Sequence, residues 1–165
     1  MSRSSNESKT NASPSRKYLV FMLNGHLYGT PLSDIKEIIG LPEFVPVPQN
    51  PDYLLGLINL RGRVISAIDL KKKLDMKKTV DIKRPAVILV EDGPKVVGCV
   101  VDAIKEVLSI RDEEIEAEIR DSVPFASRYL KGAARFTDGP MILMLDLKRI
   151  AAMDNSSSNT AGAAA

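Results

Sequence analysis

Tyr53-Leu-Leu-Gly-Leu-Ile-Asn-Leu-Arg-Gly-Arg-Val-Ile-Ser-Ala-Ile-Asp-Leu70 is the stretch that decides the fold of this chain. It is apolar for most of its length and is interrupted once, by Asn59-Leu60-Arg61-Gly62. Val, Ile and Leu suit a half-buried pleated surface, and a glycine adopts the positive φ that a tight reversal requires. The stretch therefore predicts two strands joined by a turn that holds Arg61, with its five hydrogen-bond donors, at the hairpin tip. An arginine held there favours contact with another molecule, and an ordinary solvated turn residue is the alternative.

The pattern of this stretch recurs in the second half of the chain. Repeated pairs appear in the same order at offsets of 76, 77 and 69 residues: Tyr53-x-x-Gly56 with Tyr129-x-x-Gly132, Val64–Lys71 with Met141–Lys148, and Gly29–Ile39 with Gly98–Leu108. The last pair shares an identical Ile-Lys-Glu at the same distance from glycine. Ordered matches of this kind indicate a duplicated unit, with halves at about residues 17–75 and 86–151. We expect the equivalent residues Asp69 and Asp146 to cap the helix that follows each strand.

Bulk composition bounds the class of protein. The 165 residues suffice for one domain or for two small units that share a core. A formal net charge of +2 is too small to indicate nucleic acid or membrane by itself. The single cysteine, Cys99, excludes an internal disulfide framework, and no apolar stretch reaches membrane-spanning length. We expect a soluble cytoplasmic protein that does not insert into a membrane.

The order of segments predicts a mainly β protein with short helices. Strands are expected at Tyr18–Leu23, His26–Pro31, Ala86–Glu91, Lys95–Asp102, Leu130–Phe136 and Met141–Asp146, in addition to the opening hairpin. Ser33 is expected to begin a short helix that ends at Gly40, with Ile35, Ile38 and Ile39 on one face. Many short strands with Asn-Gly and Asp-Gly turns are typical of small barrels. Because each half is marginal alone, the two should pack together.

Polar tails flank this domain. Residues 1–15 and 154–165 are dominated by small and polar side chains, which cannot bury enough apolar surface to offset the entropy of ordering. We therefore expect disordered tails on either side of a folded domain at 16–153. Short helices are also expected at Asp69–Asp75 and at Leu147–Met153, whereas Arg111–Asp121 is charged and carries no clear pattern.

A search for catalytic chemistry finds no convincing set. His26 is the only histidine, and a position beside a hairpin turn favours a surface or partly packed imidazole over a general base. Cys99 lies in an apolar run, which favours an inert buried thiol. One histidine and one cysteine match no metal-ligand spacing, and a solvated acidic face explains the glutamates of residues 113–118 better than a cation site does. No glycine-rich phosphate loop is present. We expect no enzyme activity, no cofactor and no metal.

Several segments resemble the CheW-type coupling proteins of bacterial chemotaxis. The resemblance rests mainly on Gly56–Leu70, whose Asn-Leu-Arg-Gly segment is quite specific, and it covers about residues 16–152. Further matching segments are Tyr18–Phe21, Tyr28-Gly29, Glu37–Ile39 and Val96–Ile104. Ser66-Ala67 is a departure, since many members carry Pro and an aliphatic residue there. The resemblance implies two intertwined five-stranded SH3-like β-barrels, in agreement with the duplication.

The resemblance also implies a non-enzymatic adaptor, a monomer alone that is assembled into signalling arrays. It implies two partners, the regulatory domain of the histidine kinase CheA and the cytoplasmic hairpin tip of a chemoreceptor. By position, the expected kinase-binding residues are Asn59, Leu60, Arg61 and Gly62. The expected receptor-binding residues, in a groove between the barrels, are Ile35, Glu37, Ile38, Ala86 and Val107.

The residues themselves leave an alternative function open. Residues 71–84 contain seven basic and two acidic side chains, so a small β-barrel module could bind nucleic acid through this segment. The segment lacks the interleaved aromatic side chains on which single-stranded bases stack. This lack disfavours binding of single-stranded nucleic acid, and the coupling-protein hypothesis expects no nucleic-acid partner.

Overall fold

The computed structural model describes residues 14–77, 84–122 and 128–152. The two expected disordered tails fall almost wholly outside the described residues, as do residues 78–83 of the basic segment. Within the described ranges, strands account for most of the regular structure, and the helices are short. The mainly β fold class is therefore confirmed.

The chain forms eleven strands among the described residues. In order they are β1 (Ser15–Leu23), β2 (His26–Pro31), β3 (Ile35–Gly40), β4 (Leu54–Leu60), β5 (Arg63–Asp69), β6 (Ala86–Asp92), β7 (Lys95–Val101), β8 (Ala103–Arg111), β9 (Ile115–Glu116), β10 (Leu130–Ala134) and β11 (Ile142–Leu145). The helical segments are η1 (Leu32–Asp34), α1 (Leu70–Lys73), η2 (Asp112–Glu114), η3 (Ala117–Ser122) and residues 147–152.

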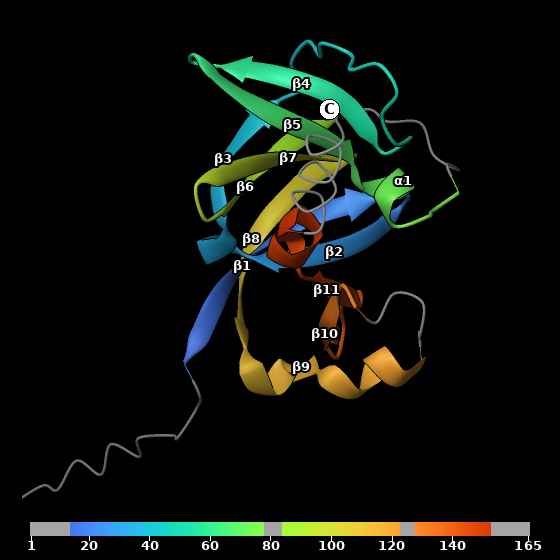
Figure 1. The fold of residues 1–165 in the computed structure, drawn as a ribbon. Helices are drawn as coiled ribbons and strands as arrows, with labels where there is room; N and C mark the ends of the chain where they lie inside the picture. The colour runs from blue at the N-terminus through green and yellow to red at the C-terminus, as the bar shows by residue number, and fades with distance from the viewer. Residues whose placement is uncertain (1–13, 78–83, 123–127, 153–165) are drawn as a thin grey trace, which may run out of the picture.

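The strands form two sheets, one above the other in Figure 1. The lower one, sheet A, has the order β8-β1-β2-β11-β10-β9, and the upper one, sheet B, has the order β3-β6-β7-β5-β4. Strand β9 has only two residues, and an isolated bridge between Val45 and Leu57 takes the equivalent place beside β4. The two sheets correspond to the predicted SH3-like barrels; sheet B has the expected five strands, and sheet A has a sixth, the two-residue β9.

Each barrel is built from both halves of the duplicated sequence. The hairpin β1–β2 of the first half lies in sheet A beside β11 of the second half, with Leu143 opposite Tyr28 in parallel pairing. The hairpin β6–β7 of the second half lies in sheet B beside β5, with Ser66 opposite Val97, again in parallel. This exchange of hairpins is the predicted intertwining.

Paired backbone features explain why the Tyr-x-x-Gly sequence is repeated. Gly56 has φ 145° and Gly132 has φ 153°, and a register shift falls beside each of them. A Cβ atom at Gly132 would lie 2.7 Å from the carbonyl oxygen of Glu116, and one at Gly56 would overlap the carbonyl oxygen of Val45. Only glycine allows this close approach of two strands.

The expected helix from Ser33 to Gly40 is wrong. Only Leu32–Asp34 forms a helical turn, without a side-chain cap, and the following six residues form strand β3. The reason is tertiary, because β3 gains a full antiparallel ladder with β6, in which Ile38 lies opposite Ile88. Its β-branched residues also fit a pleated surface better than a helix.

The cores lie inside each barrel and between the two. A central cluster contains buried residues of both sheets, such as Phe21 and Ile88, together with Leu147 and Ile150 of the last helix. Smaller clusters fill sheet B around Leu89 and sheet A around Val20 and Met144. The two barrels therefore share one apolar interior.

Both predicted helix caps are present. The Asp69 carboxylate accepts the backbone N–H of Lys71 at 3.0 Å, and the Asp146 carboxylate accepts that of Arg149 at 3.1 Å. Residues 70–73 and 147–152 are the helical segments that follow. The two aspartates therefore have the predicted capping role.

Candidate docking surfaces

The Asn-Leu-Arg-Gly segment forms the tight turn between β4 and β5. Arg61 has φ 51° and Gly62 has φ 82°, so both central residues take left-handed conformations, which match the twist of a β-hairpin. The Asn59 side chain accepts the Gly62 N–H at 3.2 Å. Leu60 packs on the cluster inside sheet B. Three residues of the segment thus hold the turn, and Arg61 projects from it with 73% of its side chain exposed.

Arg61 is fixed in direction by Glu37 of strand β3. Arg61 Nη2 donates to Glu37 Oε1 at 2.7 Å, and Nη1 donates to Oε2 at 3.1 Å. A bidentate contact of this kind fixes the plane of the guanidinium as well as its position. The hydrogen bonds from Arg61 lower the pKa of Glu37 below its ordinary value of 4.5. The same contact raises the pKa of Arg61, so both groups stay charged at neutral pH.

Strand β3 presents different residues to the two sides of sheet B. Residues opposite one another in an antiparallel pair point to the same face. Glu37 lies opposite Leu89, whose side chain fills the inside of the barrel. Ile38 lies opposite Ile88, which belongs to the central cluster between the barrels. A bulge between Ile35 and Glu37 returns Ile35 to the face of Ile38.

Three predicted receptor residues consequently share the face of sheet B that turns toward the central cluster. Ile35 and Ala86 pack partly buried against this cluster, and Ile38 lies on the same face with 39% exposure. The expectation that Ile35, Ile38 and Ile39 share one face is wrong for Ile39, which packs against the cluster inside sheet B. Glu37, which is also in the predicted set, lies on the other face of β3, and its carboxylate pairs with Arg61.

Strand β8 supplies the matching face of sheet A. Val107 lies opposite Leu19, a member of the central cluster, and is 48% exposed. Ile104, at the position equivalent to Ile35, packs against the same cluster. Sequence reasoning missed Ile104, although the repeat at an offset of 69 residues identifies it. We refer to Ile35, Ile38, Ala86, Ile104 and Val107 as the inter-barrel seam.

The residues considered as catalytic groups or metal ligands have ordinary structural environments. Cys99 is fully buried and His26 is exposed, as predicted. Glu116 pairs with Arg135, and the backbone N–H of Arg111 donates to Glu114 at 2.8 Å, so these glutamates have structural partners. Among residues 14–77, 84–122 and 128–152, no group of three or more His, Cys, Asp and Glu side chains is placed to hold a metal ion.

The basic segment is less available to a partner than its sequence suggests. Lys71 is only 4% exposed and pairs with Asp102. The ammonium of Lys73 lies 3.8 Å from the centre of the Tyr53 ring. Residues 78–83 lie outside the described residues. In the part of the chain that the structure covers, no helix has the length and apolar character needed to cross a membrane.

Comparison with known proteins places this sequence and its fold in a family. The family model described as the CheW-like domain matches residues 17–155. The chemotaxis protein CheW of Klebsiella aerogenes is 30% identical over 135 residues, covering 82% of this chain and 81% of the relative. The chemotaxis protein CheW of Bacillus subtilis is 33% identical over 101 residues, covering 61% and 65%.

A solved structure agrees with these matches. The crystal structure of the scaffolding protein TtCheW from Thermoanaerobacter tengcongensis is similar with a TM-score of 0.71 and 32% identity, covering 80% of this chain and 89% of that one. Sequence and fold thus point the same way over most of the chain. The protein therefore belongs to the family of proteins with a CheW-like domain.

Proposed function

We propose that this protein is a chemotaxis scaffold that couples chemoreceptors to the histidine kinase CheA and performs no chemistry itself. The family membership supports the scaffold role, since its relatives are chemotaxis proteins and one is named a scaffolding protein. The observation that carries the proposal is the presence of two different surfaces on one fold. One is a charged hairpin tip at Arg61, and the other is the apolar inter-barrel seam.

The hairpin tip is the proposed kinase-binding surface. Arg61 is largely exposed, yet its guanidinium is already oriented by Glu37. Arginine is favoured at protein interfaces, and a side chain that is oriented before binding loses less entropy on association. Asn59, Leu60 and Gly62 contribute by holding the turn.

The inter-barrel seam is the proposed receptor-binding surface. Its exposed members Ile38 and Val107 border a central cluster that is already packed. An apolar surface of this kind accepts the apolar stripe of an amphipathic helix, which is the form of a receptor hairpin tip. Glu37 then acts beside the seam by orienting Arg61, rather than as a receptor contact.

The kinase-binding surface is tested by exchanging its charges. Arg61→Glu should abolish binding of the CheA regulatory domain in calorimetry. Arg61→Lys should weaken this binding, because lysine cannot make the bidentate contact with Glu37 that orients the side chain. The double variant Arg61→Glu with Glu37→Arg restores the ion pair in the reverse sense. If Arg61 contacts the kinase, the double variant stays defective; full recovery of binding would show that only the internal pair matters.

The receptor-binding surface is tested with substitutions at exposed seam positions. Ile38→Asp and Val107→Asp should weaken binding of a receptor hairpin fragment while binding of the kinase domain is retained. Met141→Asp is the matched control, because Met141 is as exposed as Val107 and lies outside the seam. Equal losses for both partners, in step with the melting temperature, would remove the seam from the proposal.

A further inference from the structure

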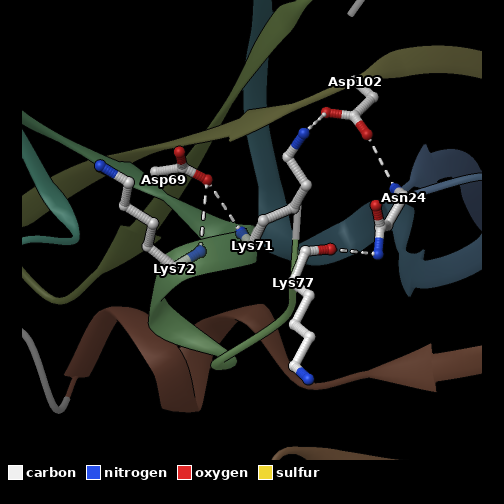
Figure 2. A network of polar contacts seen from close by, with 6 residues as sticks. All are labelled: Asn24, Asp69, Lys71, Lys72, Lys77 and Asp102. Atoms are coloured by element: carbon white, nitrogen blue, oxygen red, sulfur yellow. Dashed lines mark hydrogen bonds and ion pairs between the residues drawn. The ribbon is translucent and has the colours of Figure 1, made fainter. Parts of the chain in front are cut away.

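A network of polar contacts around a buried ion pair lies where the chain passes from one barrel to the other (Figure 2). Lys71 Nζ lies 2.7 Å from Asp102 Oδ1, with the two side chains 5% and 12% exposed. The second oxygen, Asp102 Oδ2, accepts the Asn24 N–H at 2.7 Å. Asn24 Nδ2 in turn donates to the Lys77 carbonyl at 2.7 Å. We call Asn24, Lys71 and Asp102 the crossover clamp.

The clamp joins elements of different sheets through one carboxylate. Lys71 belongs to α1, directly after β5 of sheet B, and Asn24 lies in the turn of the β1–β2 hairpin of sheet A. Asp102 stands between β7 of sheet B and β8 of sheet A. Its backbone N–H also donates to the Met22 carbonyl at 3.0 Å. Asp102 therefore holds the start of β8 against both barrels.

The clamp is not an ordinary requirement of this fold, as the duplicated sequence shows. The position equivalent to Asp102 at the crossover from β2 to β3 is Ser33, and the position equivalent to Lys71 is Lys148. Both are exposed, and no buried ion pair is found at that crossover among the described residues. One crossover thus forms without a buried charge, although the other contains one.

A buried ion pair is also a poor way to gain stability. The Lys71 ammonium makes no hydrogen bond, so its contact with Asp102 is an ion pair without favourable hydrogen-bond geometry. The cost of removing two charges from water can exceed their attraction, and in some proteins buried polar or ionic groups instead select one arrangement among several. The arrangement at stake here is the position of β8, which carries Ile104 and Val107 of the seam.

We propose that the crossover clamp positions β8 relative to sheet B and thereby sets the separation of the two sides of the inter-barrel seam. Lys71, Asp102 and Asn24 are positioning residues, which act through Val107 and Ile104 without touching a partner. The use of the seam by a receptor rests on the proposed function. The positioning itself does not, and it is measurable in the protein alone.

The test compares Lys71→Met with Lys72→Met, because Lys72 is the exposed neighbour in the same helix. Spin labels on Val64→Cys of sheet B and Met141→Cys beside sheet A report the distance between the barrels, and the buried Cys99 is not labelled. Lys71→Met should shift or broaden this distance distribution and speed hydrogen exchange of the Asn24 amide at least about tenfold. Lys72→Met should change neither quantity, and Lys71→Arg should retain the parent behaviour.

An unchanged distance distribution in folded Lys71→Met overturns the proposal, even if the melting temperature falls. Should that variant not fold, Lys71→Met with Asp102→Asn removes both charges and keeps an oxygen for the Asn24 N–H. An unchanged distance distribution in this double variant would likewise overturn the proposal. With a receptor hairpin fragment, Lys71→Met should weaken binding about tenfold and leave kinase-domain binding unchanged. A parent protein that binds no fragment contradicts the proposed function alone.

Discussion

Gly132 is a residue whose role is steric. Its φ of 153° and the Glu116 carbonyl oxygen, 2.7 Å from the position of a Cβ, leave no room for a side chain. Gly132→Ala should therefore destabilise the fold by about 2–3 kcal/mol, measured by urea unfolding. Gly40→Ala is the control, because a Cβ at Gly40 meets nothing within 4 Å. Equal stability of the two variants would show that β9 simply moves away from β10.

Single residues also mark the limit of sequence reasoning. Gly56 and Gly132 could be recognised because they recur with a tyrosine three positions earlier. Lys71 could not, since it stands in a run of three lysines that reads as one solvated surface. Its buried partner Asp102 lies 31 positions away, so the local sequence gives no sign of the contact.

The ion pair between Glu37 of β3 and Arg61 of the β4–β5 turn should be pH-dependent in its contribution to stability. Because Arg61 lowers the pKa of Glu37, the pair contributes stability above pH 4.5, and that contribution is lost as pH falls through the lowered value. Carboxyl NMR should find that Glu37 titrates below 4.5 in the parent and closer to this value in Arg61→Gln. An identical midpoint in both proteins would mean that the ion pair does not persist in solution.

At the scale of elements, local signals predicted more than non-local ones. Turn residues identified the hairpins, and Asp69 and Asp146 identified the helices that follow them. Residues 35–40 were wrongly predicted as a helix, because the ladder that makes them a strand comes from β6 in the other half. The contact of Glu37 with Arg61 was missed for the same reason, since it follows from the true face of β3.

The whole molecule should not be divisible into its sequence repeats. Residues 17–75 supply only β1–β2 to sheet A and β3, β4 and β5 to sheet B, so neither barrel is complete in this half. Peptides of residues 17–75 and 86–151 should each be unfolded by circular dichroism, and a mixture of the two should recover β structure. Cooperative thermal unfolding of either peptide alone would contradict this interleaved architecture.

The overall architecture was predictable because the duplication and the Asn59–Gly62 turn are both visible in the sequence. The placement of the hairpin tip and the inter-barrel seam relative to each other was not predictable, because it depends on which strand lies at each sheet edge. Seam residues Ile38 and Val107 occupy equivalent edge strands of different sheets. Only the assembled sheets show that both face the central cluster.

The exchange of hairpins between barrels has a consequence during synthesis. Strands β1 and β2 leave the ribosome first, but their neighbours β8 and β11 are translated only at residues 103–111 and 142–145. The β1–β2 hairpin therefore stays without its neighbouring strands, with its apolar side uncovered, until residue 145 has been translated. Nascent chains with uncovered apolar surface are prone to aggregation, so molecular chaperones should assist the folding of this domain during synthesis.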